Sequence, residues 1–132
     1  MVGRRGPSLI YDGLIDTGSD AILASDLVAD YIGLDLDDHE GETIHAVAGA
    51  IVTARYKTVA LRLHQPDGDS EAFHEWEAPV GFIGGWKNPS LLLLGSVGFL
   101  DRWTVTVSRF SQALAIEGVD VLDRRFGLVP PR

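Results

Sequence analysis

The chain has 132 residues, of which 45% are hydrophobic, and a formal net charge of -8 at pH 7. This length and apolar content predict one globular domain whose core is large enough to fold without covalent cross-links. The absence of cysteine excludes disulfides, thiolate zinc sites and cysteine nucleophiles, and favours a cytoplasmic location. Because phosphate binding depends on clustered positive charge, the acidic balance and the scattered lysines and arginines argue against nucleic acid as a partner.

No segment predicts a signal peptide, a membrane anchor or a metal centre. The longest apolar run, Leu91–Leu100, is about half the length of a membrane span and is interrupted by glycine and serine. The histidines lack metal-ligand spacing and are expected at the surface or on strands: His39, His45, His64 and His74. We therefore expect no metal, no cofactor and no membrane partner.

The predicted elements are mostly short β-strands separated by turn residues. In chain order they cover residues 9–15, two strands within 43–56 around Ala48-Gly49-Ala50, then 58–64, 72–78, 91–94, 104–108 and 113–117. This set predicts an all-β, mostly antiparallel barrel or sandwich. It forms a single domain over residues 8–121, and residues 1–7 and 122–132 are interpreted as tails.

One short helix is predicted between the first and second groups of strands. Ser25 suits the N-cap, Asp26 favours the positive end of the helix dipole, and Gly33 suits the left-handed position after the last turn. Three apolar side chains spaced four residues apart predict its packing face: Leu23, Leu27 and Tyr31. A further helical turn is expected from Gly98 to Trp103.

The residues that carry chemistry follow the first predicted strand. The sequence Asp16-Thr17-Gly18-Ser19 places an acid directly after an apolar stretch and inside a tight turn. An aspartate at such a place can simply cap the turn. Two other features favour a catalytic role, although both are also ordinary in β proteins. One is a glycine-centred hairpin at Gly49 that suits a flap, and the other is the apolar strand Leu91–Leu94, which ends at Gly95.

On these elements the chain resembles the retropepsin-like aspartic proteases. The match comprises the Asp16 motif after an apolar strand, the flap Val47-Ala48-Gly49-Ala50-Ile51, and the hydrophobic-hydrophobic-glycine element Leu93-Leu94-Gly95. The resemblance spans about residues 9–117 and implies a retropepsin-like barrel with one short helix after the catalytic turn. It also implies the site residues. Asp16, Thr17 and Gly18 would form the catalytic turn, and substrate would bind to Ser19, Ala48, Gly49 and Ala50.

The same resemblance implies a role for each neighbour of Asp16. The Thr17 hydroxyl would reach across a subunit interface, and Gly18 would let the backbone approach the carboxylates. Ser19 would donate a hydrogen bond to the outer oxygen of Asp16. Apolar side chains near the flap are candidates for specificity pockets, and burial in the core is the alternative for each: Val47, Ile51, Val80 and Phe82.

The sequence holds one Asp-Thr-Gly motif, whereas a single-chain pepsin-like enzyme needs two. The resemblance therefore implies a homodimer that pairs two Asp16 carboxylates. Two carboxylates about 3 Å apart repel by roughly 5 kcal/mol at an effective dielectric of about 20, so they share one proton. One carboxylate then takes a proton from water while the other protonates the peptide carbonyl. The prediction is an aspartic endopeptidase that acts on a polypeptide substrate.

Two other classes of function remain open from the sequence. A chain that keeps this fold without cleaving would be a peptide-binding or assembly module. An unrelated β-barrel that binds a small ligand would make the motif a coincidence. The intact triplet Asp16-Thr17-Gly18 argues against the silent module.

Overall fold

The computed structural model describes residues 11–47, 49–65, 72–86 and 90–127. Strands dominate it, so the mostly-β class predicted from the sequence is confirmed. The elements in chain order are β1 (Asp12–Ile15), β2 (Ile22–Ser25), α1 (Asp26–Tyr31), β3 (Gly41–Val47), β4 (Ala50–His64), β5 (Phe73–Ile83), β6 (Leu91–Leu94), β7 (Trp103–Ser108), β8 (Ala113–Gly118) and α2 (Val119–Phe126).

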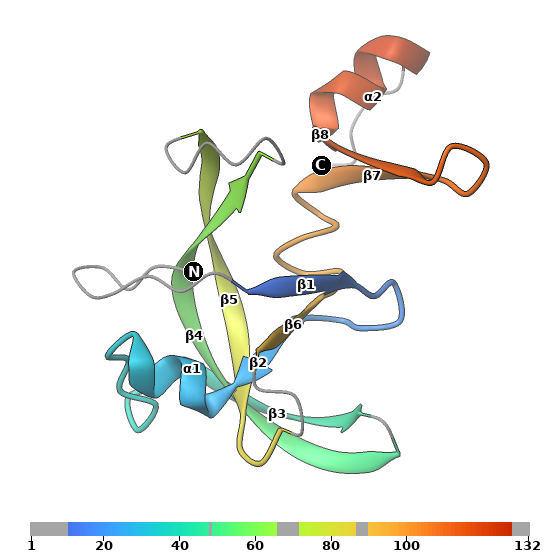
Figure 1. The fold of residues 1–132 in the computed structure, drawn as a ribbon. Coiled ribbons are helices and arrows are strands. Elements are labelled where there is room, and N and C mark those ends of the chain that lie inside the picture. Colours follow the sequence, from blue (N-terminus) through green and yellow to red (C-terminus); the bar gives the residue numbers. More distant parts are fainter. Residues whose placement is uncertain (1–10, 48, 66–71, 87–89, 128–132) are drawn as a thin grey trace.

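The strands form two sheets (Figure 1). The larger has the order β1-β6-β2-β5-β4-β3, and the smaller is the hairpin β7-β8. β1 pairs with β6 and β2 with β5 in parallel, while the other pairs are antiparallel. The larger sheet ends at β1 and β3, so the described residues contain no closed barrel. Among the described strands, none lies between β1 and β3 to join the two edges.

Strand β4 is longer than the sequence predicted. Residues 50–56 and 58–64, expected as separate strands, form one strand of 15 residues. Lys57, at the expected break, pairs with Val80 of β5, and its ammonium group donates to the carbonyl oxygens of Asp35 and Asp38. The first half of β4 pairs with β3 and the rest with β5, which gives the long twisted ribbon in Figure 1.

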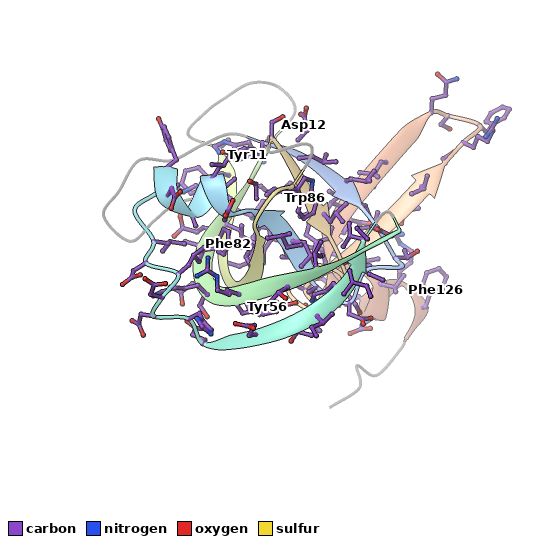
Figure 2. All side chains as sticks on the ribbon, turned by 90° about the horizontal axis from the view of Figure 1, so that it is seen from below. Tyr11, Asp12, Tyr56, Phe82, Trp86 and Phe126 are labelled. Carbon is purple, nitrogen blue, oxygen red and sulfur yellow. The ribbon has the colours of Figure 1, made fainter. Side chains whose placement is uncertain are left out.

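Strand β2 lies at the centre of the core and is buried along its whole length. Ile22 and Ala24 pack into one apolar cluster and Leu23 into another, so both faces of the strand are covered. This explains an unbroken apolar run with no alternation. Phe82 of β5 is among the largest fully buried side chains, and Figure 2 shows it inside the body formed by the larger sheet.

Helix α1 begins and ends as predicted but packs on a different face. The Leu27 N–H donates to Ser25 Oγ at 3.2 Å, and Gly33 has φ +76°. The buried helix residues are Val28 and Ala29, whereas Leu27 and Tyr31 are 59% and 56% exposed. The reason is that the chain enters the helix directly from buried β2, so Leu23 belongs to the strand and does not continue the helix face.

Two segments near the C-terminal end refine the expectation. Residues 98–102 form a run of turns in which the Trp103 N–H donates to the Phe99 carbonyl at 2.8 Å, the spacing of one helical turn, and the Gly98 N–H donates to Asp101 Oδ1 at 3.0 Å. Helix α2 covers residues 122–126 of the region interpreted as a tail and has no buried residue. Neither helix of the described part is long and apolar enough to cross a bilayer.

Candidate functional site

The Asp16 turn connects β1 to β2 and is closed by short hydrogen bonds. The Ser19 N–H donates to the Asp16 carbonyl at 3.1 Å, and the Gly18 N–H donates to Asp16 Oδ1 at 2.9 Å. A Cβ on Gly18 would lie 3.2 Å from that oxygen, so glycine allows the close approach. The side chain of Asp16 is therefore oriented by its own turn while the residue stays partly exposed.

Strand β6 lies between the two strands that flank this turn. The Asp16 N–H donates to the Leu94 carbonyl at 3.0 Å, and the Ser96 N–H donates to the Ser19 carbonyl at 2.8 Å. A Cβ on Gly95 would lie 2.3 Å from the Ala21 carbonyl oxygen and 2.4 Å from that of Ser19, which only glycine avoids. The fold thus brings together the Asp16 motif and the Leu93-Leu94-Gly95 element.

Ser19 differs from its expected role. Its hydroxyl donates to the Ala21 carbonyl at 2.8 Å and not to Asp16. The reason is local: the turn folds the Ala21 carbonyl back toward Ser19, and the Asp16 carboxylate receives the Gly18 N–H instead. Thr17 is exposed and its hydroxyl contacts no polar group in the described part of the chain, so its interface role stays a prediction.

A cleft of about 290 Å³ separates the Asp16 turn from the β3–β4 hairpin. One wall is the turn, the other is the end of β3, and the floor is apolar; the lining residues are Asp16, Gly18, Ser19, Asp20, Leu23, Ile44, His45, Ala46, Val47 and Leu93. Gly49 has φ +79°, as a tight hairpin tip requires. Gly49 and Ala50 do not line the cleft, and Ala48 lies outside the described residues. Among the described residues, the wall opposite Asp16 is therefore strand β3, and neither Gly49 nor Ala50 lines it; binding of substrate by the hairpin tip stays a prediction.

The candidate specificity residues separate into three environments. Val47 lines the cleft, Val80 and Phe82 are buried in the core, and Ile51 is 80% exposed on β4. Core burial is thus the outcome for two of the four. Trp86, which follows the Gly84-Gly85 turn, packs on the apolar cluster around Leu23.

The sequence reasoning missed Asp20 and the His45–Tyr56 pair. His45 Nε2 is hydrogen-bonded to the hydroxyl of Tyr56, whose ring lies over Gly81: a Cβ there would be 3.0 Å from Tyr56 Cζ. Burial, and secondarily the nearby charge of Asp20, raises the pKa of Tyr56. The available signal was strand alternation, because in the β3–β4 register His45 and Tyr56 fall on one face of the hairpin.

No family model, curated protein or solved structure matches the chain. Within residues 11–47, 49–65, 72–86 and 90–127, no group of three or more His, Asp and Glu side chains is arranged to hold a metal ion. The chemistry that the site can perform therefore follows from three features: a carboxylate fixed by a turn, a cleft in front of it, and an extended strand on the opposite wall.

Proposed function

We propose that this chain is a retropepsin-like aspartic endopeptidase in which the Asp16 carboxylates of two copies activate one water. The observation that carries the proposal is the shared cleft. A partly exposed aspartate, whose carboxylate accepts from the Gly18 N–H and whose own N–H donates to the Leu94 carbonyl of β6, opens onto the same space as the end of β3. Groups held before the reaction begins need no reorganisation during it.

In the proposed mechanism the two Asp16 carboxylates share one proton. The ionised Asp16 takes a proton from water as its oxygen attacks the peptide carbonyl carbon, and the protonated Asp16 gives its proton to the carbonyl oxygen. As the C–N bond of the tetrahedral intermediate breaks, the leaving amine takes the proton that the first carboxylate received from water, and a hydroxyl of the intermediate returns its proton to the other carboxylate, which restores the shared proton. Because both carboxylates are equivalent by symmetry, the acid and base roles belong to the pair.

The position of β3 supports an extended polypeptide as substrate. β3 is an edge strand of the larger sheet and lines the cleft opposite Asp16. An edge strand offers unpaired N–H and C=O groups, which bind an extended peptide by strand addition. A peptide paired with β3 would run past the carboxylate of the turn.

The first test compares two aspartate variants in the cleavage of a denatured protein mixture, followed by mass spectrometry. Asp16→Asn should lower the rate roughly 1,000-fold or more, because one member of the dyad can no longer exchange a proton. The matched control is Asp12→Asn, which changes an exposed aspartate of β1 outside the cleft and should keep the rate. Equal cleavage by both variants would remove the proposal.

A mixing experiment tests the two-copy site. If each active centre takes one Asp16 from each copy, about a tenfold excess of Asp16→Asn chains should leave roughly a tenth of the wild-type activity. The Asp12→Asn protein in the same excess should not inhibit. Undiminished wild-type activity at every ratio would show that a single copy carries the whole site.

A second candidate function has an observation of its own. The β7–β8 hairpin and α2 expose several large apolar side chains: Val107, Phe110, Leu114, Val119 and Phe126. Such a surface favours a role in assembly. If wild type and Asp16→Asn are equally inactive while light scattering shows a stable oligomer, the silent assembly module is the better description.

A further inference from the structure

The His45–Tyr56 pair links the cleft to the central sheet. Tyr56 pairs with Gly81 of β5, and its ring packs on the apolar cluster that contains Leu23 and Ala54. Its hydroxyl is hydrogen-bonded to His45 Nε2, and His45 is one of the β3 residues that line the cleft next to Asp16. Tyr56, which is anchored in the apolar cluster of the sheet, therefore holds the His45 imidazole in place.

The contact between Tyr56 and His45 can form in two ways. The Tyr56 hydroxyl can donate to His45 Nε2 or accept from it, because a phenol does both and a neutral imidazole carries its proton on either nitrogen. When the hydroxyl donates and Nε2 accepts, the ring proton lies on Nδ1. In that arrangement His45 carries a single N–H donor at its other ring nitrogen.

Asp20 supplies the complementary group. It lines the same cleft, follows the Asp16 turn directly, and is held by the Val97 N–H, which donates to its carbonyl at 2.9 Å. Its ionised carboxylate only accepts hydrogen bonds. With the Tyr56 hydroxyl donating to Nε2, the cleft offers one donor, His45 Nδ1–H, and one acceptor, Asp20, in front of Asp16.

We propose that the Tyr56 hydroxyl donates to His45 Nε2, and that the resulting donor–acceptor pair of His45 and Asp20 selects substrates with a carboxamide side chain, Asn or Gln, beside the cut bond. The side-chain carbonyl would accept from His45 Nδ1–H while the NH₂ group donates to Asp20. A carboxylate side chain of the same shape would be repelled by Asp20, and an aliphatic one would leave both groups unpaired. Tyr56 is a positioning residue that acts through His45. The inference rests on the proposed peptidase function and names its substrate class.

The first experiment maps the sites cut by the wild-type protein in a denatured protein mixture at neutral pH. Asn and Gln should be enriched at one position near the cut. Paired synthetic peptides with Gln or Glu at that position should then differ in kcat/KM on the order of tenfold. His45→Leu should abolish this difference while cleavage continues, and His64→Leu, which changes an exposed histidine outside the cleft, should preserve it.

A second measurement does not depend on activity. Nitrogen-15 NMR of the histidine rings should show His45 protonated at Nδ1 in the wild type and mixed tautomers in Tyr56→Phe. That variant should also lose the Gln over Glu preference, mainly through KM. Cleavage without Asn or Gln enrichment, or a His45 ring protonated at Nε2, would overturn the inference alone. Absence of any cleavage would instead remove the proposed function, and the inference with it.

Discussion

The larger sheet and the C-terminal arm, which we define as residues 104–126, are built in opposite ways. In the sheet, β2 is buried on both faces and paired on both sides. In the arm, β7 and β8 pair only with each other among the described strands, and α2 buries no residue. Two phenylalanines illustrate the contrast, since the relative solvent exposure of Phe82 is 1% and that of Phe110 is 101%, which means that Phe110 is fully exposed. Figure 2 likewise shows Phe126 at the outer side of α2.

The two regions meet at Trp103, which teaches where the stability of the molecule is concentrated. Its ring is buried and makes edge contacts with Trp76, at a centroid distance of 5.4 Å, and with His74, at 5.8 Å. Beyond this anchor the arm projects away from the larger sheet (Figure 1). An isolated two-stranded hairpin is marginally stable in water. The Asp16 site therefore depends on the sheet, and the arm should tolerate change.

The largest expected effect comes from a methyl group placed under the Asp16 turn. Gly95→Ala should cost about 4 kcal/mol or more, because the new Cβ meets backbone oxygens of Ala21 and Ser19 that cannot move without breaking the turn. Gly41→Ala is the matched control, since a Cβ there meets no atom within 4 Å. Urea unfolding of both proteins measures the difference, and similar midpoints would contradict the tight packing at Gly95.

A matched pair of truncations compares the two regions directly. Phe82→Ala should lower the free energy of unfolding by about 3–5 kcal/mol, because it removes a fully buried ring and leaves a cavity. Phe110→Ala should change it by less than about 0.5 kcal/mol, since that ring lies in solvent. Thermal unfolding followed by circular dichroism compares the two. A large loss at Phe110 would mean that the arm is packed against something in solution.

Two serines that accept backbone hydrogen bonds provide a smaller test. Ser25→Ala should cost about 1 kcal/mol, because its buried hydroxyl caps α1 by accepting from the Leu27 N–H. Ser108→Ala should cost a few tenths of a kcal/mol, since Ser108 accepts from the Ser111 N–H at an exposed turn of the arm. Equal costs in chemical denaturation would indicate that the arm is as cooperative as the sheet.

The smallest expected effect is on the pH dependence of the protein's stability. The Thr58 backbone N–H and then its hydroxyl, at 3.1 and 2.8 Å from the Glu40 carboxylate, lower the pKa of Glu40. A lowered pKa gives stability that is present above the ordinary value of 4.5 and is lost as the pH falls through the lowered one. Glu40→Gln should therefore reduce stability slightly at pH 7 and flatten its acid dependence. Glu77→Gln, on an exposed part of β5, is the control in melting curves from pH 3 to 7.

Structural features that depend on residues close together in the chain could be predicted from the sequence. The strand before Asp16, the Ser25 cap and the glycine at the hairpin tip all depend on residues close in the chain, and the structure has them where they were expected. The packing face of α1 was misjudged because Leu27 and Tyr31 have the right spacing but turn away from the sheet. Spacing alone does not say which side of a short helix the preceding strand covers.

The arrangement of segments that lie far apart in the chain could not be predicted from the sequence. The insertion of β6 beside the Asp16 turn, the open ends of the larger sheet and the lining of the cleft all depend on pairing between strands far apart in the chain. His45 and Tyr56 carry no motif and meet through the β3–β4 hairpin, whereas Asp20 joins them through the pairing of β2 with distant strands. The open edges of the larger sheet were likewise not predictable, because strand count and alternation do not determine whether edges meet.

The position of β6 also has a consequence for the newly made chain. Translation delivers the Asp16 turn before the strand that holds it, since β6 follows β5 in the chain. While residues 91–97 are still inside the ribosome, the turn lacks its backbone partners and the cleft lacks Leu93. The proposed site would therefore stay incomplete on a growing chain until residues 91–97 have emerged.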